Sequence, residues 1–319
     1  MGLQLSNPLT SAPRVAVTSS SFGKSDVLRD ELKRSFQNCF FNERGRPLTE
    51  PELIDFIKNA DAAVVGLEHV NANVLDHAPQ LKIIAKYGVG LDNICEESLK
   101  KRNIALRWTG GVNRRSVAEL TLCFMLGLCR NIFSSGFKLK QSDWDKNGGR
   151  QLTGKTVGII GCGFTGSEVI RLLQPFQCTL LVNDIEDKSE LCKKLNATET
   201  SLEDVITRSD IISLHVPLTS LTEKMVNADF LRRMQPTSFL INTSRGDVVD
   251  QQALKTALKK NEIAGAALDV FAEEPPSDKE FLSLPNLMVT PHIAGNARES
   301  VEAMGRSAID HLIAFFKNP

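Results

Sequence analysis

The run VGIIGCGFTG constrains the fold of this chain more than any other part of the sequence. It places Gly161, Gly163 and Gly166 in the spacing GxGxxG, directly after the apolar run Thr156–Ile160 and before a helical pattern at 168–173. This order predicts a strand, a tight turn and a helix whose N-terminal N–H groups bind phosphate. The first glycine permits the turn, the second lets a pyrophosphate approach the backbone, and the third lets the helix pack against the strand. We therefore expect a dinucleotide-binding unit.

An acidic residue at the end of the next strand-like run narrows the choice of dinucleotide. LLVND ends in Asp184, close to the usual spacing of about 20 residues after the glycines. Its carboxylate would accept hydrogen bonds from the adenosine ribose and repel a 2′-phosphate, and no Arg or Lys follows until Lys188. This favours NAD over NADP. Phe164 and Thr165, between the second and third glycines, are expected to line the same site.

Short apolar runs alternate with helical stretches through the rest of the chain, which predicts parallel sheets with helices on both faces. A last helical stretch, 298–316, is too short to form a domain and should pack on the first part of the chain. We predict an α/β protein with two doubly wound parallel-sheet domains. A flavodoxin-like substrate-binding domain, 1–108 plus 296–319, carries an inserted Rossmann NAD-binding domain, 109–295. The expected strands are 15–18, 62–65, 81–85, 156–160, 179–182, 211–214, 238–241, 264–268 and 287–289.

The composition argues against several classes of protein. With 38 basic and 38 acidic residues the formal charge is +0, so neither nucleic acid nor an anionic membrane surface is an expected partner. The seven cysteines are odd in number and form no CxxC pair, which favours reduced thiols in the cytoplasm over disulfides or a metal site. Residues 1–14 lack the apolar run of a secretory signal, and no stretch approaches the roughly 18 apolar residues of a membrane helix.

Several further motifs follow one another along the chain. They are GVGLDN (88–93), LTGKTVGIIG (152–161), LHVPLT (214–219), LINTSRGDVVD (240–250), GAALDVFAEEPP (265–276) and TPHIAGN (290–296). In their order and spacing they resemble the D-isomer-specific 2-hydroxyacid dehydrogenases, from about residue 80 to nearly the end of the chain. The resemblance implies an NAD-dependent enzyme that interconverts a D-2-hydroxy acid and its 2-oxo acid, and a homodimer formed through the cofactor domain, with Trp144 as an interface anchor.

The resemblance also implies a catalytic set. His292 suits proton transfer because imidazole titrates near neutral pH. Glu274, directly before Pro275, holds the position of the acid that pairs with this histidine and raises its pKa. On composition alone Glu273 is an equal rival. Arg245 follows a strand and offers a planar fork that suits a carboxylate.

Cofactor contacts follow from the same motifs. Val216 and Thr243 are expected to contact NAD through the backbone, and Asp269 to meet the nicotinamide carboxamide. Asp269 could equally be a structural acid that caps the following turn.

Substrate contacts are expected in the first domain. The N–H groups of Val89 and Gly90, in a glycine-rich turn, could hold the substrate carboxylate as a backbone nest holds an anion, together with Arg245. Lys86 stands where similar D-3-phosphoglycerate dehydrogenases carry a cation for the substrate phosphate, although those often have arginine. A lysine at a strand end could equally be plain solvated surface.

Three functions remain open at this point. The favoured one is oxidation of D-3-phosphoglycerate, as in serine biosynthesis. Reduction of glyoxylate, hydroxypyruvate or another 2-oxo acid is the alternative, since the same catalytic set serves all of them. From another class, corepressors that resemble this family use the fold as an NAD-sensing binding module, and the fold alone does not separate them from enzymes.

Overall fold

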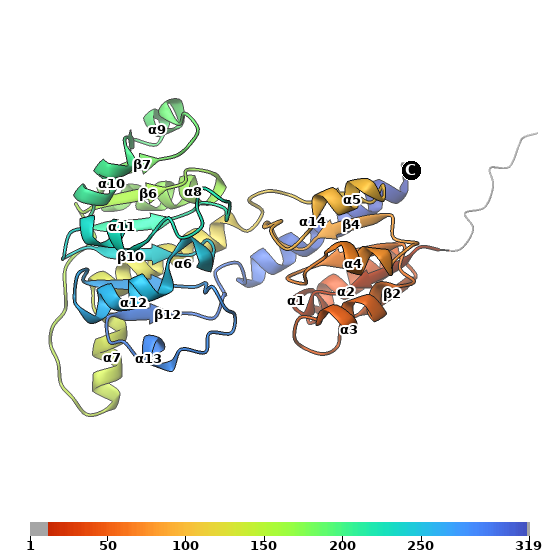
Figure 1. Ribbon diagram of the computed structural model, residues 1–319, viewed down its shortest axis with the longest axis horizontal. Coiled ribbons are helices and arrows are strands. Elements are labelled where there is room, and N and C mark those ends of the chain that lie inside the picture. The colour runs from red at the N-terminus through yellow and green to blue at the C-terminus, as the bar shows by residue number, and fades with distance from the viewer. Residues whose placement is uncertain (1–11, 318–319) are drawn as a thin grey trace, which may run out of the picture. The chain divides into compact units, whose positions relative to one another are not determined.

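The computed structural model describes residues 12–317, so most of the N-terminal stretch considered above lies outside the described residues. The described residues divide into two compact units, 12–113 with 298–317, and 114–297. Each is a parallel sheet with helices on both faces (Figure 1). The chain passes between the units after Asn113 and after Ala297, whereas we expected crossovers at 108/109 and 295/296.

The first unit contains a five-stranded sheet in the order β2-β1-β3-β4-β5, in which every described pair is parallel. The expected strands are present with shifts of one or two residues, and Lys86 is the last residue of β4 rather than the first after it. The strands are β1 Arg14–Val17, β2 Asn38–Phe41, β3 Ala62–Val65, β4 Ile83–Lys86 and β5 Ala105–Arg107. The helices are α1 Ser20–Gly23, α2 Asp26–Ser35, α3 Glu50–Ile57, α4 Ala72–Asp76, α5 Glu96–Lys101 and α14 Arg298–Lys317.

Alternating strand residues build a core on each face of this sheet. In β1, Val15 and Val17 join the core that α14 helps to cover, while Ala16 joins the core on the other face. The last helix, α14, packs on α2 and β4, as expected from the sequence. Gly305 allows the close approach, because a Cβ there would lie 2.3 Å from a methyl carbon of the buried Leu28.

The second unit contains a seven-stranded parallel sheet in the order β12-β11-β10-β9-β6-β7-β8 within the described residues. The order reverses beside β6, and such a reversal is the place where doubly wound sheets bind ligands. The strands are β6 Thr156–Ile160, β7 Thr179–Asn183, β8 Thr198–Glu199, β9 Ile211–Leu214, β10 Phe239–Asn242, β11 Gly265–Leu268 and β12 Leu287–Val289. The helices are α6 Arg114–Cys129, α7 Ile132–Lys140, α8 Phe164–Leu173, α9 Ser189–Lys194, α10 Leu202–Arg208, α11 Ala228–Arg233, α12 Gln251–Lys259 and α13 Lys279–Leu282.

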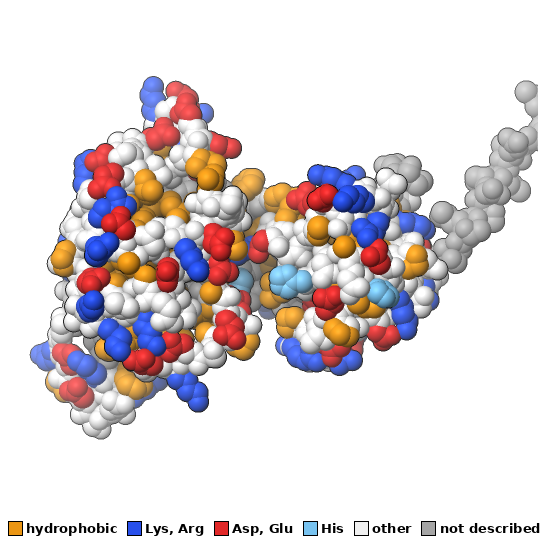
Figure 2. Space-filling model, viewed as in Figure 1, with side chains coloured by type: hydrophobic (Ala, Val, Ile, Leu, Met, Phe, Trp, Pro, Cys, Tyr) orange, Lys and Arg blue, Asp and Glu red, His pale blue; other side chains and the backbone are white. Residues whose placement is uncertain are grey.

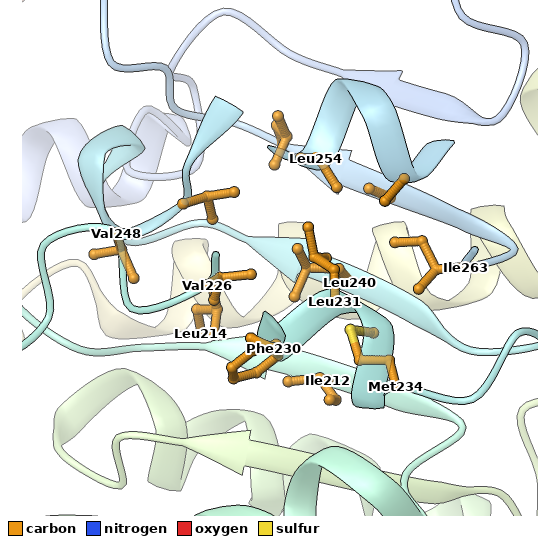
Figure 3. Packing of buried hydrophobic residues seen from close by; sticks show 14 of the residues in the cluster. Ile212, Leu214, Val226, Phe230, Leu231, Met234, Leu240, Val248, Leu254 and Ile263 are labelled. Carbon is orange, nitrogen blue, oxygen red and sulfur yellow. The ribbon is translucent and has the colours of Figure 1, made fainter. Parts of the chain in front are cut away.

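A buried apolar cluster holds one face of this second sheet. Ile212, Leu214 and Leu240 on the strands pack against Phe230 and Leu231 of α11 (Figure 3). Burial of each such side chain contributes roughly 1.5 to 3 kcal/mol to folding. The cluster fixes the carboxyl ends of β9 and β10, where the motif residues follow.

Helix α7 differs from the other helices of this unit because every one of its residues is at least partly exposed. Within residues 12–317, no single helix has the length and hydropathy to cross a membrane, and only α6 with α7, bent by 64° at their junction, meet those criteria as a pair. Basic and acidic side chains are interspersed over the visible face of each unit (Figure 2).

Candidate active site

His292 lies in the loop after β12, and its Nδ1 is 2.7 Å from Oε2 of Glu274. The backbone of His292 is left-handed, with φ of +52°, which a side chain other than glycine adopts only when its surroundings enforce it. Here the His292 N–H donates to the Asp269 carbonyl at 2.8 Å. The loop therefore fixes the imidazole in one orientation toward the carboxylate.

The two partners shift each other's pKa in opposite directions. The hydrogen bond to Glu274 raises the pKa of His292, although burial opposes this. Burial raises the pKa of Glu274, but the hydrogen bonds from His292 and the Phe271 N–H, the latter at 3.0 Å, outweigh it and hold that pKa below its usual value. The pairing thus stabilises an imidazolium facing a carboxylate relative to the two neutral groups.

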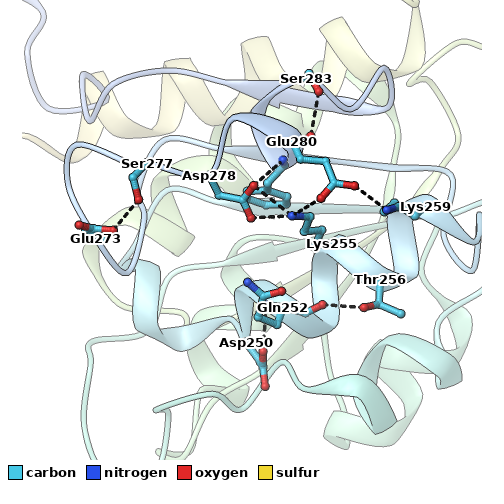
Figure 4. A network of polar contacts seen from close by, with 11 residues as sticks. Asp250, Gln252, Lys255, Thr256, Lys259, Glu273, Ser277, Asp278, Glu280 and Ser283 are labelled. Atoms are coloured by element: carbon cyan, nitrogen blue, oxygen red, sulfur yellow. Dashed lines mark hydrogen bonds and ion pairs between the residues drawn. The ribbon is translucent and has the colours of Figure 1, made fainter.

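Glu273 has a different partner. Its Oε2 accepts from Ser277 Oγ at 2.9 Å in the loop that leads to α13 (Figure 4). The far end of this loop is anchored to α12, since Lys255 donates to Asp278 at 2.7 Å and pairs with Glu280 at 2.8 Å (Figure 4). Of the two rivals left open by the sequence, only Glu274 is hydrogen-bonded to His292.

Asp269 is fully buried after β11, and the contacts of its side chain serve the loop that carries His292. Its carboxylate accepts from Thr290 Oγ1 at 2.5 Å and from the N–H groups of Ile293 and Ala294, each at 2.8 Å. Burial raises the pKa of Asp269, and these bonds oppose that rise. Asp269 therefore has a structural role, but in the loop after β12 and not in the turn that directly follows it, which the sequence left open beside the cofactor role.

Arg245 follows β10, which pairs in parallel with β11, and β11 pairs with β12. The residues after these three neighbouring strands therefore meet at one edge of the sheet. The charge of Arg245 contributes to the lowered pKa of Glu274 and partly offsets the rise in the pKa of His292. Gly246 lets the loops touch, because a Cβ there would lie 1.9 Å from the backbone carbon of Phe271. Arg245 Nη1 also donates to the Ser244 carbonyl at 2.7 Å.

The glycine loop has the geometry that its spacing predicts. Gly161 has φ of +89°, and a Cβ on Gly166 would lie 2.1 Å from the Gly161 carbonyl oxygen, so helix and strand pack directly. A Cβ on Gly163 would meet open space, which leaves room for a phosphate before the N-terminus of α8. Phe164, with 57% of its surface exposed, and Thr165 form the first turn of that helix. The cradle fits the pyrophosphate of NAD.

Asp184 closes this cradle at the end of β7. Its Oδ2 accepts from the Cys162 N–H at 2.6 Å, and its Oδ1 accepts from the Glu186 N–H at 3.0 Å. The next residue, Ile185, was missed by the sequence reasoning. It is 90% exposed, an unusual position for a large apolar side chain. Its place directly after the acid that is expected to bind the ribose is the sequence signal that could have singled it out.

Val216 and Thr243 follow β9 and β10, beside the glycine loop. Val216 reaches the turn directly, since a Cβ on Gly161 would lie 2.9 Å from its methyl carbon. Thr243 is buried and its hydroxyl is 2.9 Å from that of Thr121 on α6. His215, at the same edge, is kept neutral because burial lowers its pKa to about 3, so it differs sharply from His292 as an acid or base.

In the first unit, Val89 and Gly90 are partly exposed and their backbone N–H groups have no acceptor among residues 12–317. Lys86, the last residue of β4, lies inside the first unit. It is 5% exposed, and its Nζ donates to the Gly66 carbonyl and, at 2.7 Å, to Asn93 Oδ1. It is therefore not solvated surface, and its ammonium is engaged inside the unit.

Residues 12–317 contain no group of three His, Cys, Asp or Glu side chains placed to hold a metal ion. A family model, the NAD-binding domain of the D-isomer specific 2-hydroxyacid dehydrogenases, matches residues 122–294. Glyoxylate reductase from Pyrococcus furiosus is 37% identical over 283 residues, which make up 86% of this chain and 84% of that protein. D-3-phosphoglycerate dehydrogenase from Methanocaldococcus jannaschii is 36% identical over 285 residues, which make up 88% of this chain and 54% of that protein.

A solved structure of a 2-hydroxyacid dehydrogenase is similar to this chain over nearly its whole length. D-lactate dehydrogenase from Aquifex aeolicus, complexed with NAD and lactic acid, matches with a TM-score of 0.83 and 29% identity, covering 95% of this chain and 96% of that one. The chain therefore belongs to the D-isomer-specific 2-hydroxyacid dehydrogenase family and is an NAD-dependent oxidoreductase.

Proposed function

We propose that this enzyme reduces a small, unphosphorylated 2-oxo acid of the glyoxylate or hydroxypyruvate type to the 2-hydroxy acid with NADH. The observation that carries the proposal is the position of Lys86, because a buried ammonium that donates to Gly66 and Asn93 is not presented to a substrate phosphate. The similarity to a protein named glyoxylate reductase points the same way. Both observations favour reduction of a 2-oxo acid over oxidation of 3-phosphoglycerate, the reaction that the sequence alone favoured.

In this proposal the described side chains divide the chemistry among them. NADH supplies the hydride. His292 donates a proton from Nε2 to the carbonyl oxygen, while Glu274 holds the Nδ1 proton and stabilises the imidazolium. Arg245 binds the carboxylate and polarises the carbonyl, and the N–H groups of Val89 and Gly90 bind the carboxylate as well.

Cofactor contacts are assigned to the cradle in the second unit. The N-terminal turn of α8, with Gly163 and Thr165, would receive the pyrophosphate, and Asp184 the ribose hydroxyls. Val216, Thr243 and Asp269 are assigned to the nicotinamide end, with Asp269 acting mainly through the loop that it caps.

Turnover tests the proposal directly. Initial rates of NADH oxidation are measured with glyoxylate, hydroxypyruvate and pyruvate, and NADH binding is followed by fluorescence quenching in the same buffer. We expect saturable oxidation with at least one of these acids. Tight NADH binding without turnover of any 2-oxo acid would favour the NAD-sensing binding protein instead.

A homodimer is a further part of the proposal. Ile132, Phe133 and Phe137 of α7 are each more than half exposed, and Trp144, in the segment after it, is 74% exposed. Large apolar side chains grouped in this way mark protein contact surfaces. Light scattering should give twice the chain mass for the wild type and a smaller mass for Phe137→Lys. The matched control Leu221→Lys, at another exposed apolar residue, should leave the mass unchanged.

We assign the enzyme to the cytoplasm. All seven cysteines lie among the described residues as free thiols, which fits a reducing compartment. Cell fractionation checks this, and recovery in an oxidising compartment would contradict it.

A further inference from the structure

Three loops at the carboxyl edge of the first sheet are joined by buried polar groups. Thr18 follows β1, Glu68 lies in the loop after β3, and Lys86 is the last residue of β4, before the third loop; their exposed fractions are 0%, 3% and 5%. Charged groups are rarely buried to this extent, because removing each from water costs several kcal/mol unless it is well partnered. Their retention at one edge of the sheet needs a reason beyond packing.

Lys86 and Asn93 together clamp the β3 and β4 loops. Lys86 Nζ donates to the Gly66 carbonyl and to Asn93 Oδ1. Asn93 Nδ2 in turn donates to the carbonyls of Gly66, at 3.0 Å, and Glu68, at 2.6 Å. The Asn93 amide thus uses its oxygen to accept from Lys86 and its nitrogen to donate to Gly66 and Glu68.

Glu68 extends the network to β1. Its Oε2 accepts from Thr18 Oγ1 at 2.7 Å and from the Gly66 N–H at 3.1 Å. The Gly66 residue therefore stands between the two buried charges, with its N–H facing the carboxylate and its carbonyl facing the ammonium. Opposite charges disposed in this way stabilise each other across one loop.

The turn between the two clamped positions is the one assigned to the substrate carboxylate. It starts at Gly88, with φ of +119°, and exposes the N–H groups of Val89 and Gly90, which have no acceptor in the described part of the chain. Lys86 lies before the turn and Asn93 after it. The clamp consequently fixes both ends of the turn while leaving its N–H groups open.

We propose that Lys86 and Asn93 are positioning residues, which hold the Gly88–Leu91 turn in the shape that presents the Val89 and Gly90 N–H groups to the substrate carboxylate. The inference rests on the proposed function, which gives the turn its ligand. Lys86 acts through Asn93 and Gly66 and does not itself contact substrate. A preformed anion site binds more tightly because no ordering is needed when the ligand arrives.

The test compares Lys86→Met, which keeps the length of the side chain and removes its donors, with Lys82→Met. Lys82 precedes the same strand at its other end, where it pairs with Asp61 at 2.9 Å. Since charge-assisted hydrogen bonds contribute about 1.5 to 3 kcal/mol, we expect Lys86→Met to raise the KM for glyoxylate about 10-fold to 100-fold. The kcat and the KM for NADH should stay within about twofold, and Lys82→Met should resemble the wild type.

Hydrogen exchange supplies a readout that does not depend on turnover. The Ile94 N–H donates to Leu91 and the Cys95 N–H to Val70, so both report on the clamp. We expect faster exchange at these amides in Lys86→Met and not in Lys82→Met. Asn93→Ser should reproduce both effects if Lys86→Met does not fold, and the double variant should be no worse than either single one.

The outcomes separate the two proposals. A lower thermal midpoint with unchanged KM for glyoxylate and unchanged exchange would overturn the positioning role. Selective loss of a phosphorylated substrate in Lys86→Met would overturn it too, since Lys86 would then be a phosphate contact. If the wild type turns over no 2-oxo acid, the proposed function fails, and the exchange rates still decide whether Lys86 holds the turn.

Discussion

The carboxyl edges of the two sheets treat their charged side chains in opposite ways. In the first unit Lys86 and Glu68 are almost completely buried within a network of loop contacts. In the second unit the paired side chains of His292 and Glu274 remain 35% and 34% exposed. In our proposal this difference in burial reflects a difference in role: the edge of the first sheet holds a turn in a fixed shape, and the edge of the second sheet provides groups that exchange a proton.

The largest expected effect comes from removing the proton donor of the exposed edge. His292→Asn should lower kcat for 2-oxo acid reduction about 10²-fold to 10⁴-fold, the usual contribution of a general acid. Stopped-flow and steady-state rates measure this, with NADH affinity as the control, because His292 lies outside the glycine loop. A loss of kcat below about threefold would mean that His292 is not the proton donor, and that the edge of the second sheet does not supply the proton.

The second prediction concerns pH. Because Glu274 raises the pKa of His292, the imidazolium needed for reduction persists below that raised pKa and is lost as pH rises through it. Glu274→Gln removes the charge, so the fall in kcat/KM should move to lower pH by about 1 pH unit or more. The control is Glu273→Gln, whose carboxylate accepts from Ser277 instead, and whose pH profile should match the wild type. Identical profiles for all three proteins would contradict the pairing.

The sequence predicted the interior of both sheets better than their margins. Ala62–Val65 and Ile211–Leu214 are fully buried, and their mostly apolar composition, interrupted only by Ser213, made them recognisable as strands. The sequence did not predict β2, β5 or β8, because these short edge strands are partly exposed and contain polar residues such as Asn38.

The two edges also differed in how far the sequence could predict them. The expectation that Glu274 pairs with His292 came from the motif resemblance, which places the acid directly before Pro275, whereas composition alone left Glu273 an equal rival. The state of Lys86 was not foreseen, because it depends on Gly66 and Asn93, which approach it only after β3 and β4 have paired. Ile185 was missed because its significance lies in its exposure, which a sequence does not state.

The third prediction tests the cofactor end of the exposed edge. Asp184→Ser should raise the KM for NADH about 10-fold, through loss of charged hydrogen bonds to the ribose, and should narrow the preference for NADH over NADPH. The exposed neighbour Glu186 provides the control, and Glu186→Gln should change neither constant appreciably. Steady-state titration of both cofactors measures the effect, and an unchanged preference would contradict the assigned role of Asp184.

The smallest effect on activity is expected from a change remote from both edges. In Gly305→Ala the new Cβ would lie 2.3 Å from a methyl carbon of Leu28, so the packing must shift. We expect the free energy of unfolding to fall by about 1 to 3 kcal/mol, while kcat stays near the wild-type value. Urea unfolding gives the free energy, with Asp310→Ala on the exposed side of the same helix as control. A large fall in kcat without loss of stability would show that α14 affects the edges directly.

The proposed chemistry is tested most directly by a pair of substrates that differ only in a phosphate group. The measurement is kcat/KM for hydroxypyruvate and for its 3-phospho derivative with NADH, under identical conditions. Because Lys86 is engaged with Gly66 and Asn93, we predict a higher kcat/KM for hydroxypyruvate. A higher value for the phosphorylated acid would contradict it and restore the phosphoglycerate function.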